Sequence, residues 1–327
     1  MNGCMKTLVT TVGMLFLLGG AVLASGEAEA EEFPSREIQV IATFGAGGGV
    51  DTFTRALTAT ASEHLGQEMV VRNVTGAGGA TGAIEVYNSR PDGYTLMSID
   101  SSLTTLEVFR GDDLPFKTSE FEPLGIVMYS PTWIISNTAQ TYPTFDDFLS
   151  AAEANPGEVS IGTAGPSGSQ FLMAQVLEAQ LNIDLNIVPF DGGGTLMSRL
   201  AGDQVDAGSI HTPVGIDFIE AGEIKVLALG GPRDAVAVDV EDVPTFEDLG
   251  IPQEFMVYRA LFAPPGTPQE IIDVLAEAVR KMAQDEQFQE FGASWGVMPT
   301  YLDPEASREL MERDLEMFKE VYRRFVE

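Results

Sequence analysis

Four glycine-rich loops are the part of this sequence best suited to chemistry. They occupy residues 45–51, 76–82, 165–169 and 191–195, and each lies between an apolar segment and a segment with helical periodicity. Glycine lets a backbone approach a ligand closely, and the first NH groups of a helix lack intrahelical partners and carry partial positive charge. Each loop is therefore a candidate anion site, and two loops in each half of the chain predict two jaws around one acidic molecule.

The same loops do not match the motifs of nucleotide-binding or hydrolytic enzymes. None contains the lysine of a P-loop, and Val50 stands where the dinucleotide fingerprint has its third glycine. The stretch Gly165–Ser169 departs from Gly-x-Ser-x-Gly and has Pro166 in the turn. Two histidines, His64 and His211, do not suffice for a histidine-rich metal site. We therefore expect no catalysis, no cofactor and no metal.

Several side chains near these loops each admit two interpretations. Asp51 either caps a helix or contacts the ligand. Ser101 and Ser102 follow a predicted strand, where a parallel sheet delivers ligand contacts, or they stabilise a turn. His211 follows a short predicted strand and either donates to a carboxylate or belongs to the core or hinge. Arg259, in an apolar stretch, pairs either with the ligand or with a buried acid between the lobes.

Strands and helices must alternate to position these loops. Apolar runs predict strands, and segments with an apolar face predict helices between them. The predicted strands are Ile38–Phe44, Met69–Val71, Tyr94–Ile99, Trp133–Ile135, Val159–Gly162, Leu185–Pro189, Ala207–Ile210 and Ile224–Leu229. This alternation predicts parallel sheets covered by helices, in two α/β lobes. Asp303 and Pro304 are placed as the N-cap and first residue of a last helix.

Composition is that of a packed globular protein with a strong acidic excess. The chain has 327 residues, 44% hydrophobic and 20% charged, which is enough for two ordinary domains. Its 18 basic residues against 49 acidic ones give a net charge of −31, which makes nucleic acid an unsuitable partner. The excess fits either a surface adapted to high salt or an acidic secreted protein.

Residues 1–24 have the order of a secretory signal peptide. Lys6 precedes a short apolar run, and small residues follow. We expect cleavage near Ala24, a solvated tether over residues 25–33, and a periplasmic protein. The alternative is an uncleaved membrane anchor, for which the interrupted apolar run is barely long enough. Cys4 lies before the run rather than after it, so we expect no lipid anchor.

Several short motifs follow one another in a characteristic order along the chain. They include Gly47-Gly48-Gly49-Val50-Asp51, Gly76-Ala77-Gly78-Gly79, Pro91-Asp92-Gly93-Tyr94, Val188-Pro189-Phe190-Asp191-Gly192-Gly193, Gly202-Asp203-Gln204-Val205-Asp206 and Ala263-Pro264-Pro265-Gly266-Thr267-Pro268. In this order and spacing the sequence resembles the solute-binding proteins of tripartite tricarboxylate transporters, the TctC or Bug family. The resemblance covers essentially the whole mature chain.

The resemblance implies a two-lobed periplasmic binding protein, a type II Venus flytrap with mainly parallel sheets flanked by helices. Lobe 1 is expected to combine residues 34–130 with 256–327, and lobe 2 to comprise 131–255. The chain is expected to cross between lobes near residues 128–135 and 250–260. The implied function is capture of a small mono-, di- or tricarboxylate by lobe closure and its delivery to the integral-membrane permease subunits.

The resemblance also implies a ligand site. Relatives hold a carboxylate through backbone NH groups and bridging waters in loops that correspond to residues 44–51 and 163–169. They often carry a histidine where this chain has Phe171, and an aromatic-lysine pair at Phe190 and Asp191. With the side chains above, the predicted ligand-binding set is Phe44, Gly45, Ala46, Gly47, Gly48, Gly49, Asp51, Ser101, Ser102, Thr163, Gly165, Ser167, Gly168, Ser169, Phe190, Gly192, Gly193 and His211.

Two alternative functions stay open at this point. A secreted α/β enzyme could use the glycine loops as an oxyanion site, although the sequence shows no evident nucleophile and base. A receptor that signals to a membrane kinase would bind the same ligand.

Overall fold

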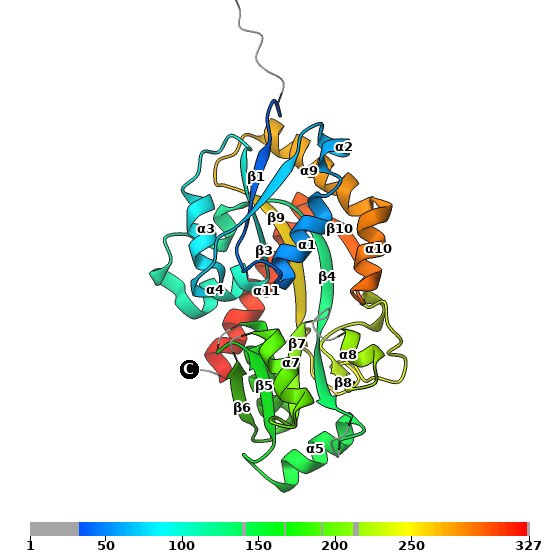
Figure 1. Cartoon of the computed structure of the whole chain (residues 1–327). Coiled ribbons are helices and arrows are strands. Elements are labelled where there is room, and N and C mark those ends of the chain that lie inside the picture. The colour runs from blue at the N-terminus through cyan, green and yellow to red at the C-terminus, as the bar shows by residue number, and fades with distance from the viewer. Residues whose placement is uncertain (1–32, 139–141, 167, 191, 212–215, 326–327) are drawn as a thin grey trace, which may run out of the picture. The chain divides into compact units, whose positions relative to one another are not determined.

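Strand pairing joins the described residues into one ten-stranded sheet (Figure 1). The computed structural model describes residues 33–325 except 139–141, 167, 191 and 212–215. The predicted signal peptide and nearly all of the predicted tether lie outside the described residues. The strands are β1 (Ile38–Ala42), β2 (Met69–Asn73), β3 (Thr95–Asp100), β4 (Glu122–Asn137), β5 (Ser160–Ala164), β6 (Asn186–Phe190), β7 (Ala207–His211), β8 (Ile224–Leu229), β9 (Met256–Ala263) and β10 (Pro299–Leu302).

Helices follow most of the strands (Figure 1). They are α1 (Gly49–Thr58), α2 (Ala61–Leu65), α3 (Ala80–Tyr87), α4 (Ser102–Arg110), α5 (Phe145–Ala154), α6 (Ser169–Leu181), α7 (Gly193–Ala201), α8 (Ile216–Glu220), α9 (Gln269–Gln284), α10 (Glu286–Ser294) and α11 (Pro304–Phe325). Short 3-10 helices are η1 (Ala77–Gly79), η2 (Gly111–Asp113), η3 (Thr118–Glu120) and η4 (Arg233–Ala235).

The sheet is parallel in two places and antiparallel between them. Its order is β2-β1-β3-β9-β4-β7-β5-β6, with β8 and β10 also paired to β4. The predicted parallel arrangement is found where β1 pairs with β2 and β3, and where β5 pairs with β6 and β7. The strands that connect these groups, β9 and β4, pair antiparallel with their neighbours.

Strand β4 pairs antiparallel with strands on both sides of the sheet. Residues 122–131 pair with β9, and residues 132–137 pair with β7 and β8. We call β1, β2, β3, β9, β10 and residues 122–131 the first half-sheet. The second half-sheet is β5 to β8 with residues 132–137. One 16-residue strand therefore runs through both half-sheets (Figure 1).

Helix α11 also contacts the cores of both half-sheets. It begins as predicted, because the Asp303 carboxylate accepts a hydrogen bond from Ala306 N at 2.9 Å. Leu310 packs in a cluster with side chains of β1, β3 and β9, whereas Phe318 packs in a cluster with side chains of β4 and β5. Burial of such large apolar side chains contributes about 1.5–3 kcal/mol each, so α11 binds the two half-sheets together.

Asp314 is a buried carboxyl group on α11. Its Oδ1 lies 3.5 Å from Arg313 Nη2, and the same nitrogen donates to the Tyr129 hydroxyl at 3.0 Å. Burial raises the pKa of Asp314 to about 6, the charge of Arg313 opposes this rise, and the charge of Glu254 adds to it. The charged form is therefore unfavourable in the folded protein.

We expect Asp314→Asn to stabilise the fold at pH 7.5 by roughly 2 kcal/mol and to change little at pH 4. The folded pKa lies above the ordinary value of 3.8, so the stability that the neutral carboxyl provides is complete below about pH 4 and is lost as the pH rises through about 6. Urea unfolding at both pH values measures the difference. Exposed Glu316 on the same helix supplies the control Glu316→Gln, and a stabilisation by Asp314→Asn that is equal at both pH values would contradict the assignment.

Candidate functional site

Each of the four glycine loops ends at a helix whose N-cap residue is glycine. These residues are Gly48, Gly79, Gly168 and Gly192, before α1, α3, α6 and α7. Most helices use Ser, Thr, Asp or Asn there, whose side chains accept hydrogen bonds from first-turn NH groups. Glycine has no such side chain, and no N-cap bond closes these four helices. The predicted arrangement of strand, glycine loop and helix is confirmed.

Three of these loops meet at one cavity of about 580 Å³. The carboxyl ends of β1 and β3 reach it from the first half-sheet, and those of β5, β6 and β7 from the second. This is the edge of parallel strands where α/β proteins place ligands. The lining residues are Phe44, Gly45, Ala46, Gly48, Gly49, Val50, Asp100, Ser102, Ala164, Gly165, Pro166, Gln170, Phe190, Gly192, Gly193, Ile210, His211 and Arg259.

A second cavity, of about 410 Å³, adjoins the first. The two share part of their lining, including Phe44, Gly165 and His211. The remaining glycine loop contributes to this second cavity through Ala77 and Gly78. All four glycine loops are thus grouped around two adjoining spaces.

The two cavities bring together most of the predicted ligand-binding set. Lining residues from that set are Phe44, Gly45, Ala46, Gly48, Gly49, Ser102, Gly165, Gly168, Ser169, Phe190, Gly192, Gly193 and His211. Gly47, Asp51, Ser101 and Thr163 line neither cavity, and Ser167 lies outside the described residues. Asp100 and Gln170 are lining residues that the predicted set lacks, although each lies next to a member of the set in the sequence. Ligand contact by any of these residues stays a prediction.

Asp51 shapes the first loop rather than lining the cavity. Its carboxylate accepts hydrogen bonds from Gly47 N at 2.8 Å, and from Arg55 Nε and Asn73 Nδ2 at 2.9 Å each. Burial disfavours the ionised form, but these hydrogen bonds outweigh burial and hold the pKa of Asp51 below its ordinary value. The capping interpretation is wrong in its strict sense, because Gly48 is the N-cap residue of α1 and no side chain caps this helix. Asp51 lies in the first turn and binds the loop at Gly47 instead.

Two other predicted residues also hold loops in place. Thr163 Oγ1 donates to the carbonyl oxygen of Gly165 at 2.8 Å, which fixes the loop after β5. Ser102 N donates to Asp100 Oδ1 at 2.9 Å, and the Ser102 hydroxyl donates to the same oxygen. Ser102 therefore stabilises the turn after β3 while also lining the cavities.

His211 is a neutral hydrogen-bonding group at the cavity. It ends β7, and its Nε2 lies 3.0 Å from the hydroxyl oxygen of Ser169, the first residue of α6. Removal from water lowers the pKa of His211 to about 4, the negative charge of Asp100 opposes this, and the positive charge of Arg259 adds to it. At neutral pH the ring is uncharged, with one nitrogen that donates and one that accepts.

Arg259 is the buried cation of the site. It is 3% exposed, and β9 places it opposite Asp100 of β3. Its Nη1 lies 3.9 Å from Asp100 Oδ2, and its guanidinium carbon lies 5.7 Å from the centre of the Phe53 ring. Burial lowers the pKa of Arg259 and the charge of Asp100 opposes this, but an arginine side chain stays protonated in proteins. Arg259 thus faces both a buried acid and the cavity.

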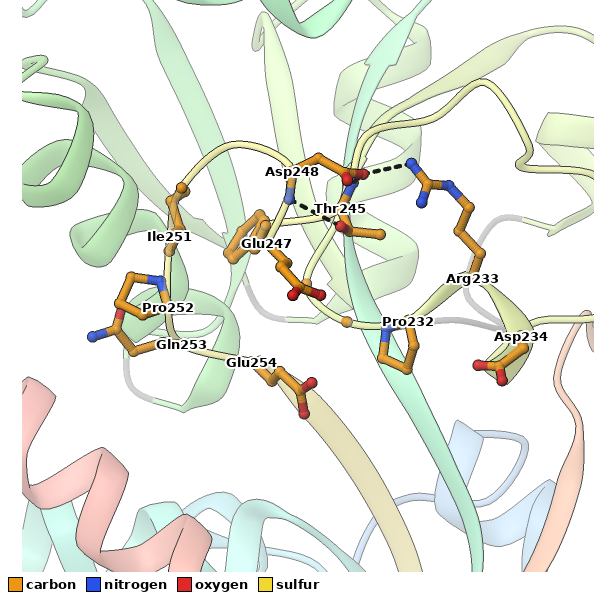
Figure 2. Close-up of a pocket in the computed structure, with 14 residues that line it drawn as sticks. Pro232, Arg233, Asp234, Thr245, Glu247, Asp248, Ile251, Pro252, Gln253 and Glu254 are labelled. Carbon is orange, nitrogen blue, oxygen red and sulfur yellow. Dashed lines mark hydrogen bonds and ion pairs between the residues drawn. The ribbon is translucent and has the colours of Figure 1, made fainter.

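A larger cavity, of about 850 Å³, lies elsewhere and is less suited to an anion (Figure 2). Its lining includes the acids Asp234, Glu247, Asp248 and Glu254. Among its lining residues Arg233 is the basic side chain, and its Nη2 already donates to Asp248 at 2.5 Å (Figure 2). Carboxylates at this surface repel a negatively charged solute.

In the described part of the chain, no cluster of three or more His, Cys, Asp or Glu side chains has an arrangement that could hold a metal ion. No helix in the described ranges combines the length and apolar character needed to cross a bilayer.

Comparison with known proteins gives consistent matches over most of the chain. A family model described as "Tripartite tricarboxylate transporter family receptor" matches residues 53–324. Protein BugT of Bordetella pertussis is 28% identical over 325 residues, which cover 98% of this chain and 97% of BugT. A solved structure described as a periplasmic transporter is 31% identical with a TM-score of 0.80, over 89% of this chain and 97% of that one. MatC of Rhodopseudomonas palustris, solved with bound malate, is 25% identical with a TM-score of 0.75, over 88% and 99%.

We expect the His211 ring to be neutral at pH 6 and to titrate with a midpoint near 4, because the buried site disfavours the charged ring. The chain has two histidines, so nitrogen-15 NMR of the imidazoles gives two resolvable ring systems. His211→Gln assigns the signals by removing one. A midpoint near 6.5 for His211 would show that the ring is solvated instead.

Proposed function

Because the chain belongs to the tripartite tricarboxylate transporter receptor family, as its motifs predicted, we propose that its cavity captures a small carboxylate for delivery to a membrane permease. The protein is a solute-binding receptor, and its fold is that of the periplasmic binding proteins, as expected from the sequence. Malate bound to MatC supports a mono-, di- or tricarboxylate as the ligand class.

One observation carries this proposal: three helix starts without side-chain caps converge on the same cavity. Helix α1 comes from the first half-sheet, and α6 and α7 come from the second. A helix start stabilises an anion by about 0.3–1 kcal/mol when exposed and by up to about 2 kcal/mol when partly buried. A cavity of about 580 Å³ is within the range of small-molecule sites.

The charge of the whole protein makes such local donors necessary. At a net charge of −31 the protein repels anions at long range. Salt screens this repulsion beyond about 10 Å at 0.1 M, whereas an NH group in direct contact with a carboxylate is hardly screened. Backbone donors at the helix starts therefore select an anion that the surface does not attract.

The lobe boundaries follow from the half-sheets in this proposal. Lobe 1 comprises residues 34–130 and 256–327, and lobe 2 comprises 131–255, with closure about β4 and β9. The change of β4 partners between Pro131 and Thr132 supports a boundary there. The packing of Phe318 with the second half-sheet means that closure also involves the last turns of α11.

The receptor is proposed to act in the periplasm without catalysis. Cleavage near Ala24 would release it there, and the permease subunits are its proposed membrane partners. The hydroxyl of Ser169 does lie next to His211, as a nucleophile and base would. Among the described residues, the other ring nitrogen of His211 donates no hydrogen bond to a carboxylate, as the histidine of a catalytic triad does.

Thermal denaturation of the mature protein with acetate, succinate, malate, adipate and citrate tests the function. We expect at least one carboxylate, at about 100 times its Kd, to raise Tm by about 5 °C, since binding to the folded state alone adds about 2.7 kcal/mol. Sulfate and chloride at equal ionic strength are the controls. NMR of the recovered solute should show it unchanged. A flat Tm across the whole panel, or conversion of the solute, would contradict the proposal.

We expect Gly45→Leu to weaken carboxylate binding by at least about tenfold and to leave the fold intact. Gly45 lines the cavity, and a Cβ atom there meets no atom within 4 Å, so a side chain fits the fold but takes up ligand space. Calorimetric titration measures Kd, and urea unfolding measures stability.

Gly194→Leu is the matched control for this variant. Gly194 lies in α7 outside the cavity lining, and a Cβ atom there also meets nothing within 4 Å. Gly48 is a less suitable test position because a Cβ atom there would lie 3.0 Å from Gly45 O, inside the turn itself. Equal affinity of Gly45→Leu and Gly194→Leu would remove the first loop from the site.

A further inference from the structure

Arg259 and the start of α1 approach each other at one point of the cavity. A Cβ atom on Gly49 would lie 3.1 Å from Arg259 Nη2, so glycine at this position leaves the guanidinium next to the first residue of the helix. Both residues line the cavity. A group bound at the open NH groups of α1 therefore lies within reach of the arginine.

Two hydrogen-bond donors of Arg259 have no acceptor within the described part of the protein. Its Nε and Nη1 atoms are buried and have no hydrogen-bond partner among the described residues. The distance of 3.9 Å between Nη1 and Asp100 Oδ2 is an ion-pair distance that is too long for a hydrogen bond. Buried donors without partners are unfavourable, and a guanidinium is suited to bind a carboxylate through two parallel hydrogen bonds.

Asp100, the acid beside Arg259, forms hydrogen bonds with another residue. Asp100 Oδ1 accepts from the NH and the hydroxyl of Ser102, so this carboxylate is held by the turn after β3 and is kept from closing on Arg259. Asp100 therefore orients the guanidinium and balances its charge without satisfying its Nε and Nη1 donors.

We propose that Arg259 is a ligand-binding residue that donates to a carboxylate seated at the start of α1. This inference rests on the proposed function and names a side chain that determines specificity within the site. The carboxylate accepts hydrogen bonds from backbone NH groups of α1 on one side and from the guanidinium group of Arg259 on another. His211, neutral at the same cavity, adds a polar contact without adding charge.

Calorimetric titration of Arg259→Gln and Arg259→Lys tests the assignment. The probe is the carboxylate of the acetate, succinate, malate, adipate and citrate panel that binds the wild type most tightly. We expect Arg259→Gln to weaken binding by about 10- to 100-fold, the range of a hydrogen bond to a charged group. Arg259→Lys should recover part of the loss, because it restores the charge without the planar fork. The Kd of Arg259→Gln should also depend less on NaCl concentration than that of the wild type.

Arg280→Gln is the control, because it removes the same charge from an exposed position on α9. We expect its Kd to stay within twofold of the wild type. Should Arg259→Gln not fold, as judged by circular dichroism, Gly49→Ala takes its place. Its methyl group would lie against Nη2 and displace the guanidinium, which weakens binding while the arginine is retained.

The outcomes separate this inference from the function on which it rests. A wild-type protein that binds no carboxylate of the panel overturns the proposed function. A wild type that binds, together with an Arg259→Gln variant of equal affinity and equal salt dependence, overturns the role of Arg259 and leaves the function standing. If Arg259→Gln does not fold, a Gly49→Ala variant with the affinity of the wild type likewise overturns the role of Arg259.

Discussion

Helix starts without side-chain caps are the constraint on which this molecule depends. A helix begins with NH groups that need acceptors, and a side chain at the N-cap usually provides one. At α1, α6 and α7 the N-cap residue is glycine, so the helix starts that line a shared cavity have no side-chain acceptor of their own. In the proposed complex a bound carboxylate supplies the missing acceptor, which accounts for anion binding by a strongly acidic protein.

Rigid loops keep those donors in place. Asp51 accepts three hydrogen bonds around the first loop, Thr163 binds the carbonyl group of the third, and Ser102 binds Asp100 after β3. None of these bonds needs a ligand. These polar side chains are thus occupied by the protein itself, whereas the helix starts and Arg259 are the donors that we assign to the ligand. This division separates the residues that shape the site from those free to bind.

Local signals in the sequence predicted the loops and many elements, but not the strands between the half-sheets. Strand β8 has its predicted bounds, and Asp303 caps α11 as predicted, since both features depend on adjacent residues. The predicted strand Trp133–Ile135 was too short, because Pro123 and Pro131 usually end strands. In the structure both prolines lie within β4, where the register shifts at bulges. The lining by Asp100 depends on which strand ends meet, and that is a property of the assembled sheet.

The position of Arg259 links binding to the architecture. Its strand, β9, pairs on one side with β3, which carries Asp100, and on the other with β4, the strand common to both half-sheets. A cation in a peripheral loop would follow that loop, whereas a cation in β9 keeps its place relative to the strand that joins the half-sheets. The starts of α6 and α7 belong to the second half-sheet, so in the proposed complex they add donors to a carboxylate that Arg259 and α1 hold from the first half-sheet. The proposed anion site therefore needs the positive charge of Arg259 on β9 and backbone NH groups from both half-sheets, and neither half-sheet provides it alone.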